Sequence, residues 1–263
     1  MTSVGGARTI TSLNNPTVKA VRALHRRKGR EETGRFLVEG LKSVVEAVTL
    51  GRSPRTLLYG EAASGHPLLR QVEAAAGETL LVSPAILEKI SRRDNPQAVL
   101  GVFDQVFATL GDLAPASARC WVALETVRDP GNLGAIIRTA DAAGCGAVIL
   151  VGECCDPYSV EAVRATMGSI FATPIVRATV PEFLAWRRRW PGSVVGTLLS
   201  AAVDFRAAPY RDPTLLVMGN EQAGLTAALA ETCDVAVKIP MRGRADSLNL
   251  AVATGVMIYA ATG

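Results

Sequence analysis

Ile239-Pro-Met-Arg-Gly-Arg-Ala-Asp-Ser-Leu-Asn249 joins an apolar, strand-like run to the last helical pattern of the chain. Two earlier segments are built in the same way, Asp129-Pro-Gly-Asn-Leu-Gly-Ala-Ile-Ile-Arg138 and Met218-Gly-Asn-Glu-Gln-Ala-Gly224. Each has an ordinary explanation as a turn or a helix cap, with Asn132, Asp246 and Ser247 as candidate capping residues. In an open α/β sheet, however, ligands bind at the carboxyl ends of strands, so the three segments together predict one site.

The region around these segments alternates between strand and helix patterns. Strand-like apolar runs fall at 121–124, 146–151, 174–176, 193–198, 214–218 and 234–238, and helical patterns at 132–143, 159–168, 181–189, 223–231 and 247–261. Strands separated by single helices favour a parallel sheet covered on both faces. The second half is therefore predicted to be a doubly wound α/β domain with a mostly parallel sheet.

The first half predicts a smaller α/β sandwich. Helices are expected at 16–29, from Gly40 to about Leu50, at 67–76 and at 84–91, and strands at 36–40, 56–59, 79–82 and 99–107, again in a largely parallel sheet. The stretch Gly111 to Ser117 contains Pro115 and small residues and is the best candidate linker. Because 263 residues suffice for two ordinary domains, we expect domains at 1–110 and 118–263, joined by a linker at 111–117.

Composition indicates a folded, soluble protein without a metal site. Hydrophobic residues make up 49% of the chain and charged residues 20%, and no apolar stretch approaches the roughly 20 residues that cross a bilayer. Nothing in residues 1–9 has the length of a signal peptide, so we expect a cytoplasmic location and no membrane. The five cysteines include no C-x-x-C pair and the two histidines, His25 and His66, precede the motif segments, which argues against a disulfide framework and against zinc.

The net charge of +4 is unevenly distributed. Residues 1–115 hold 15 Lys and Arg against 11 acidic residues, whereas residues 116–263 hold 13 of each. The excess is concentrated between Lys19 and Arg35. Clustered cations predict a polyanion partner; the alternative is a solvated helix face. The candidate polyanion-binding residues, which become candidate RNA-binding residues if the partner is RNA, are Arg22, Arg26, Arg27, Lys28, Arg30 and Arg35.

The three segments also form a family pattern. The order D-P-x-N-x-G-x-x-x-R-T, M-G-x-E-x-x-G-L and I-P-M-x-G-x-x-x-S-L-N resembles the SpoU (TrmH-like) RNA ribose 2′-O-methyltransferases of the knotted SPOUT superfamily, with Tyr158 to Ser169 also similar. The first half is similar to that family's substrate-binding extension, a ribosomal-protein-like RNA-binding fold, through Ile10 to Pro16, Phe36 to Gly40 and Arg93 to Pro96.

The resemblance implies a deep C-terminal trefoil knot, S-adenosylmethionine as the cofactor and a homodimer formed through the methyltransferase domain. Carried over by position, the residues of the cofactor site are Thr197, Gly219, Ile239 and Leu248, and those of the catalytic site are Arg138, Asn132, Glu221, Ser247 and Asn249.

The implied reaction is an in-line attack of a ribose 2′-hydroxyl on a sulfonium methyl group, which requires orientation and loss of a proton but no metal. Arg138 matches the family's catalytic arginine. Arginine is too basic to act alone as a general base, so we expect Arg138 to bind an adjacent RNA phosphate and to lower the pKa of the hydroxyl, with that phosphate as a proton relay. Asn132, Glu221, Ser247 and Asn249 would fix the arginine and the ribose.

Ribosomal RNA of the large subunit is favoured as the substrate only through the N-terminal extension. The alternatives are a transfer RNA ribose methyltransferase and a non-catalytic RNA-binding protein on the same scaffold, such as a ribosome-assembly or resistance factor. A dinucleotide-dependent oxidoreductase is disfavoured, because the G-x-G-x-x-G spacing is absent and the motif half has no histidine. The sequence does not identify the methylated nucleotide.

Overall fold

The computed structural model describes residues 7–92 and 95–263, which fall into two compact units. The first unit runs to Gln105 and also contains Tyr158–Phe171, while the second consists of Val106–Pro157 and Ala172–Gly263. This division differs from the predicted boundaries. The predicted linker at 111–117 lies in the second unit, where the short 3₁₀ helices Leu110–Asp112 and Pro115–Ser117 are found.

The first unit is built on a five-stranded sheet in the order β1-β4-β3-β5-β2. Its strands are β1 (Arg8–Ile10), β2 (Arg35–Glu39), β3 (Thr56–Tyr59), β4 (Glu78–Val82) and β5 (Val99–Asp104). The sheet is mixed, not largely parallel as predicted, because β5 lies antiparallel between β2 and β3. Apolar periodicity identifies a strand but not the end from which it enters the sheet.

Helices of the first unit are α1 (Pro16–Ala23), α2 (Arg27–Thr33), α3 (Leu41–Thr49), α4 (Pro67–Ala75), α5 (Pro84–Ser91) and α7 (Val160–Thr166). The helix predicted at 16–29 is thus two helices. Gly29 explains the break, because a Cβ atom there would lie 2.3 Å from the Ala23 carbonyl oxygen. Only glycine lets α2 approach the end of α1 so closely.

The segment Tyr158–Phe171 belongs to the first unit because its side chains pack there. Arg164, on α7, pairs with Glu39 at 2.7 Å, and the Glu39 side chain is only 2% exposed. Arg164 also donates to the Ser91 carbonyl oxygen at 3.1 Å, and the Tyr158 ring lies 4.6 Å from that of Phe36. A buried ion pair of this kind holds only where both partners stay in register, so α7 is anchored on the first unit's sheet.

The second unit contains a seven-stranded sheet, ordered β10-β12-β9-β11-β6-β7-β8, in which every pairing is parallel. The strands are β6 (Cys120–Glu125), β7 (Val148–Val151), β8 (Ile175–Ala178), β9 (Val194–Thr197), β10 (Val203–Asp204), β11 (Thr214–Met218) and β12 (Val235–Lys238). This sheet confirms the predicted α/β fold with a mostly parallel sheet. The trefoil knot remains a prediction from the resemblance.

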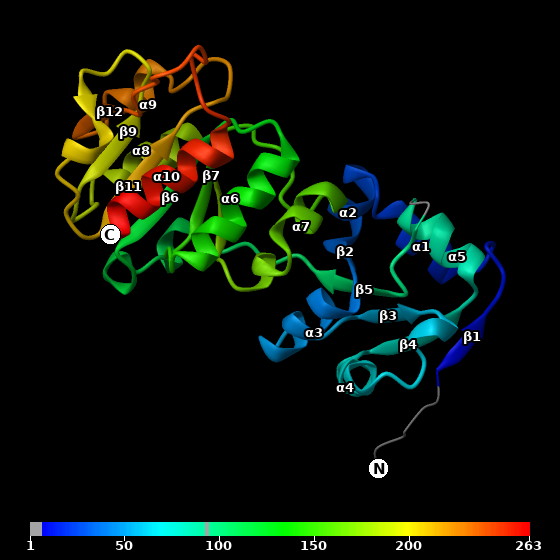
Figure 1. Ribbon diagram of the computed structural model, residues 1–263. Coiled ribbons are helices and arrows are strands. Elements are labelled where there is room, and N and C mark those ends of the chain that lie inside the picture. The colour runs from blue at the N-terminus through cyan, green and yellow to red at the C-terminus, as the bar shows by residue number, and fades with distance from the viewer. Residues whose placement is uncertain (1–6, 93–94) are drawn as a thin grey trace. The chain divides into compact units, whose positions relative to one another are not determined.

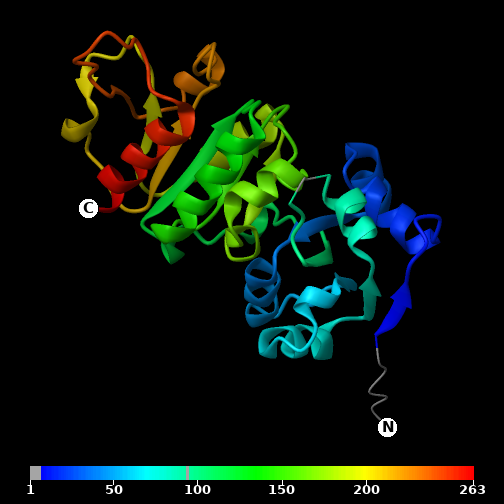
Figure 2. The ribbon, with the colours of Figure 1, turned by 45° about the vertical axis from the view of Figure 1, so that its right-hand side comes forward.

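Helices cover both faces of this sheet. They are α6 (Pro130–Ala142), α8 (Val180–Arg187), α9 (Ala227–Ala230) and α10 (Leu250–Thr262). Trp121, Phe183 and Leu229 belong to the core between the sheet and helices α8 and α9. Helix α10 packs on α6, β6 and β11, and α6 (green) and α10 (red) lie side by side in both Figure 1 and Figure 2.

The strand order contains a switch point. From β6 the sheet grows through β7 to β8 on one side, and β11 and β9 lie on its other side. The order therefore reverses next to β6, and crevices at such switch points bind ligands beyond the carboxyl ends of the strands.

Among residues 7–92 and 95–263, no helix combines the length and the apolar character needed to span a membrane.

Candidate active site

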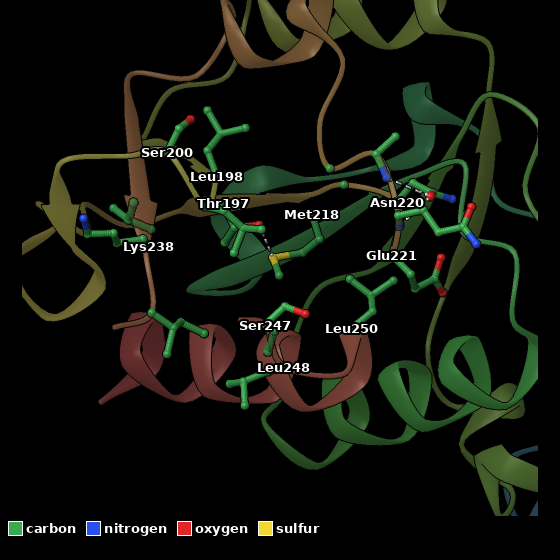
Figure 3. Close-up of a pocket in the computed structure, with 18 of the residues that line it drawn as sticks. Thr197, Leu198, Ser200, Met218, Asn220, Glu221, Lys238, Ser247, Leu248 and Leu250 are labelled. Atoms are coloured by element: carbon green, nitrogen blue, oxygen red, sulfur yellow. Dashed lines mark hydrogen bonds between the residues drawn. The ribbon is translucent and has the colours of Figure 1, made fainter. Parts of the chain in front are cut away.

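A pocket of about 330 Å³ opens at the carboxyl ends of β9, β11 and β12. Its walls come from residues 197–200, 218–224 and 237–239, from Met241, and from 247–248 with the start of α10. Figure 3 shows Ser247 and Leu248 on one side of the space, Thr197 and Leu198 on the other, and Met218 between them. The volume falls within the range of small-molecule sites.

The pocket lining is mainly apolar. Thr197 donates its hydroxyl to the Met218 sulfur at 3.6 Å, while Lys238 and Glu221 lie at opposite ends of the space (Figure 3). All four residues predicted to bind a cofactor line this pocket: Thr197, Gly219, Ile239 and Leu248. Apolar walls with accessible backbone groups suit a ligand that combines an aromatic ring with a flexible polar chain.

A hydrogen-bonded network of three predicted catalytic residues adjoins the pocket. The Asn132 amide nitrogen donates to Glu221 Oε1 at 3.2 Å, and its amide oxygen accepts from Asn249 Nδ2 at 2.9 Å. Glu221 lies in the loop after β11, and the two asparagines lie in the first turn of α6 and just before α10. The three sequence segments thus meet at one edge of the sheet.

The helix caps differ from the predicted ones, and the difference explains why the Asn132 side chain is free to bond to Glu221 and Asn249. Asp129, not Asn132, caps α6, because its Oδ1 accepts from the Asn132 backbone N–H at 2.6 Å and Pro130 occupies the first turn. Asn249, rather than Asp246 or Ser247, caps α10 by accepting from the N–H groups of Ala251 and Val252. The Asn132 side chain is therefore left to join Glu221 to Asn249.

The other two predicted catalytic residues lie outside this network. Ser247 is exposed, lines the pocket and donates weakly to Asp246 Oδ1 at 3.5 Å. Arg138 is exposed on α6, six residues beyond Asn132, which places it about 9 Å further along the helix axis. The amide network therefore does not fix the Arg138 side chain, contrary to expectation.

Sequence reasoning missed two residues that support the site. Glu125, at the end of β6, is 2% exposed and accepts two hydrogen bonds from Thr226. Asn220 donates its side-chain amide to the Thr126 carbonyl oxygen at 2.9 Å. The signal for Glu125 was present, because a carboxylate ends an otherwise apolar strand, Cys120–Glu125.

A cysteine also lies near the network. Burial raises the pKa of Cys155 to about 12, and the neighbouring Cys154, Asp129 and Glu221 act in the same direction. Its thiol therefore stays protonated near neutral pH. Within the part of the chain that the structure describes, no group of three or more His, Cys, Asp and Glu side chains is arranged to hold a metal ion.

The predicted RNA-binding residues lie on α1, on α2 and its N-cap Arg26, and at the start of β2. Arg26, Arg27, Lys28 and Arg35 are exposed and Arg22 is partly exposed. Acidic neighbours pair with three of them, through Arg27–Glu31, Lys28–Glu32 and Arg35–Asp104. Exposed pairs like these are weak, so the cations remain able to bind phosphates.

Arg30 is the exception and corrects the prediction. It is 4% exposed, and its guanidinium donates to the Leu24 carbonyl oxygen at 2.8 Å. That bond joins α2 to the end of α1, so Arg30 has a structural position and is not suited to direct RNA contact.

Comparison with known proteins identifies the family. Residues 119–259, more than half of the chain, match the model of the SpoU rRNA Methylase family. The chain belongs to the SpoU rRNA methylase family. In this SpoU methylase, residues 15–101 also match the model of the MRM3-like substrate binding domain.

Relatives of this SpoU methylase align along nearly its full length. RlmP of Bacillus subtilis, a 23S rRNA (guanosine(2553)-2′-O)-methyltransferase, is 33% identical over 95% of this chain and 97% of its own. A 23S rRNA (uridine(2479)-2′-O)-methyltransferase of Streptomyces viridochromogenes is 35% identical, with coverages of 97% and 92%. The crystal structure of an AdoMet-bound rRNA methyltransferase from Sinorhizobium meliloti has a TM-score of 0.91 and 49% identity, covering 98% of both chains.

Proposed function

We propose that this protein transfers a methyl group from S-adenosylmethionine to a ribose 2′-hydroxyl of large-subunit ribosomal RNA. The observation that carries the proposal is the position of the Asn132–Glu221–Asn249 network beside the apolar pocket, at one edge of the parallel sheet. A cofactor site and a set of polar groups that can orient a second substrate therefore lie together, as a transfer between two bound molecules requires.

The pocket fits S-adenosylmethionine. Gly219 has no room for a side chain, since a Cβ atom there would lie 2.1 Å from the Gly224 carbonyl carbon, so the loop presents its backbone to the space. Ile239 and Leu248 supply apolar contacts suited to an adenine ring, and Thr197 supplies a hydroxyl. When bound, the cofactor supplies a methyl group activated on a sulfonium.

The chain's own residues would orient the RNA. Asn132 is held on both sides, by Glu221 and by Asn249, so its position beside the pocket is fixed before the substrate arrives. Ser247 presents an exposed hydroxyl at the same edge and can contact the ribose. Preorganised polar groups of this kind lower the barrier because they need no rearrangement during the reaction.

Arg138 is proposed to bind an RNA phosphate next to the reacting ribose. Among the residues that the structure describes, its guanidinium has no ion-pair or hydrogen-bond partner, and it is exposed to solvent. A free arginine fork suits bidentate contact with a phosphate. The positive charge would favour loss of the hydroxyl proton, with the phosphate as its acceptor.

Two relatives support ribosomal RNA as the substrate, since the names of both specify 23S rRNA. They do not indicate the base, because one acts on guanosine and the other on uridine at nearly equal identity to this chain. The substrate-binding domain model at residues 15–101 covers the basic helices α1 and α2. A ribosomal substrate also fits the cytoplasmic location predicted from the sequence.

We further propose a homodimer formed through α6 and α10. Helix α10 has 13 residues and no charged side chain, yet Val252 and Tyr259 are 54% and 58% exposed. With Ala135 and Thr139 of α6, they line an open, mostly apolar groove. A helix that is apolar on all sides is typical of buried positions, and a second copy of the chain would bury this one.

Labelled methyl transfer tests the proposed function. The purified protein is incubated with methyl-labelled S-adenosylmethionine and either 23S rRNA, large ribosomal subunits or transfer RNA. We expect label in ribosomal RNA, within alkali-resistant dinucleotides, because a 2′-O-methyl group blocks cleavage at the adjacent phosphate. Label in transfer RNA alone would favour a transfer RNA enzyme. RNA binding without cofactor binding in calorimetry would favour the non-catalytic alternative.

A further inference from the structure

Glu125 is a buried carboxylate without a cation. It ends β6, is 2% exposed, and forms no ion pair with any residue in 7–92 or 95–263. Burying a charge is costly unless hydrogen bonds replace its hydration. Its hydrogen-bond partners therefore indicate what the carboxylate does at this position.

Both partners are groups of one residue. Thr226 donates its backbone N–H to Glu125 Oε2 at 2.8 Å and its hydroxyl to Oε1 at 2.6 Å. Thr226 immediately precedes α9, but its hydroxyl makes no capping bond to that helix. Both carboxylate oxygens of Glu125 thus accept hydrogen bonds from Thr226, the last residue of the loop between β11 and α9.

That loop is closed by its own hydrogen bonds. Asn220 and Gly224 exchange two backbone hydrogen bonds, at 2.9 and 3.0 Å, and Asn220 Oδ1 accepts from the Gln222 N–H at 2.9 Å. This closed turn also explains why the helix predicted at 223–231 begins only at Ala227. Because these bonds are all internal to the turn, its position depends on the residues to which its two ends are bonded.

Glu125, the last residue of β6, and the next residue, Thr126, bind the two ends of the turn. Asn220 donates to the Thr126 carbonyl oxygen at 2.9 Å, and Thr226 donates to Glu125. Thr126 adopts a φ of +49°, which is unusual for a β-branched residue and persists where surrounding contacts enforce it. The Glu125–Thr226 hydrogen bonds thus fix the C-terminal end of the turn, and we call these two bonds the latch.

The latched turn serves both parts of the proposed active site. Residues 219–224 form one wall of the pocket, and Glu221 within them accepts from Asn132. We propose that Glu125 is a positioning residue: its carboxylate holds the 219–225 turn where it can bind S-adenosylmethionine and support Asn132. The inference rests on the proposed methyltransferase function and concerns residues that touch neither the cofactor nor RNA.

Two pairs of variants test the latch by calorimetric cofactor binding and steady-state kinetics. Glu125→Ala and Thr226→Val should weaken S-adenosylmethionine binding about tenfold and raise its KM, and should also lower kcat, because the displaced turn no longer places Glu221 against Asn132. Glu125→Gln and Thr226→Ser should remain within about threefold of the wild type. Glutamine can accept the Thr226 N–H with its oxygen and donate its amide to the hydroxyl.

Thr214→Val is the matched structural control. Thr214 is fully buried and bonds to Ser193 at 3.1 Å, at the opposite end of the strand that leads into the turn. Its loss should lower the unfolding temperature and leave cofactor affinity unchanged. Wild-type affinity in a destabilised Glu125→Ala protein would overturn the positioning role, as would equal impairment of Glu125→Gln. If the wild-type protein itself did not bind S-adenosylmethionine, the proposed function would fail first, and this inference with it.

Discussion

At the scale of single residues, Arg138 stands apart from the other predicted catalytic side chains. Asn132, Glu221 and Asn249 bond to one another and Ser247 lines the adjoining pocket, whereas Arg138 extends from α6 into solvent. The motif predicted which residue types belong to the site but not their contacts, since a guanidinium that binds substrate phosphate needs no partner in the free protein. The RNA itself would bring the arginine into the site.

Replacing Arg138 separates catalysis from folding. Arg138→Ala should lower kcat at least about a hundredfold, since removal of one preorganised charge or donor typically costs that much. Its unfolding temperature and cofactor affinity should match the wild type, because the side chain is exposed and makes no hydrogen bond or ion pair among the described residues. Arg188→Ala, an exposed arginine after α8 in the same unit, is the control and should retain full activity. Full methyl transfer by Arg138→Ala would refute the catalytic assignment.

Residue-level prediction failed where two or three residues compete for one structural role. Asp129 and Asn132 are both good caps for α6, as Asp246, Ser247 and Asn249 are for α10, and sequence alone does not rank them. The structure gives the caps to Asp129 and Asn249. The carboxylate that ends β6 was visible in the sequence, but the role of Glu125 depends on Thr226, 101 residues away, and no local pattern reports that contact.

The cysteines provide a test of the electrostatics near the site. A hydrogen bond from Cys120 lowers the pKa of Cys145, whereas burial and nearby carboxylates raise that of Cys155 to about 12. Thiolates are the reactive species, so at pH 8 iodoacetamide should modify Cys145 at least about tenfold faster than Cys155. The Cys155 rate should stay low across the neutral range, because its pKa lies well above that range. Mass spectrometry of the native protein measures both rates, with urea-unfolded protein as the control. Earlier labelling of Cys155 would contradict the assignment.

At the scale of elements, apolar periodicity located most helices and strands, and its failures are specific. It missed β1 and β10, which have only three and two residues and therefore too few positions to show a period. It joined α1 to α2, because the break depends on a tertiary contact between Gly29 and Ala23. It also failed to give the direction of β5, which depends on its neighbours in the sheet.

The segment that was predicted as one helix contains two arginines with opposite roles, Arg26 just before α2 and Arg30 within it. Arg26→Ala should reduce RNA affinity and flatten its salt dependence without changing stability, because Arg26 is exposed. Arg30→Ala should instead lower the free energy of unfolding by about 1 to 3 kcal/mol, since it removes a buried, charged donor to Leu24. Filter binding at several salt concentrations and urea unfolding measure the two effects. The same loss of RNA affinity in a folded Arg30→Ala protein, with none in Arg26→Ala, would reverse these assignments.

At the scale of the whole molecule, the chain does not divide where its composition suggested. The predicted boundary relied on Pro115 and small residues. The segment Tyr158–Phe171, from the second half of the sequence, nevertheless belongs to the first unit. The cause is a pair of residues 125 positions apart, Arg164 and Glu39, whose ion pair is invisible in local composition. Family resemblance predicted both modules correctly, whereas their exact limits depend on such long-range contacts.

The exposed apolar face of α10 in the second unit predicts that two chains associate through it. Val252 and Tyr259 are seven residues apart, which places them on the same face of α10, beside the groove with α6. The double variant Val252→Glu, Tyr259→Glu should weaken dimerisation at least about a hundredfold, because burying unpaired carboxylates costs several kcal/mol. Sedimentation equilibrium should therefore show a monomer. The circular dichroism spectrum of this variant should match that of the wild type. Leu50→Glu, at an exposed apolar position after α3 of the first unit, should remain dimeric. A wild-type monomer, or a double variant that still dimerises, would show that this face is not the interface.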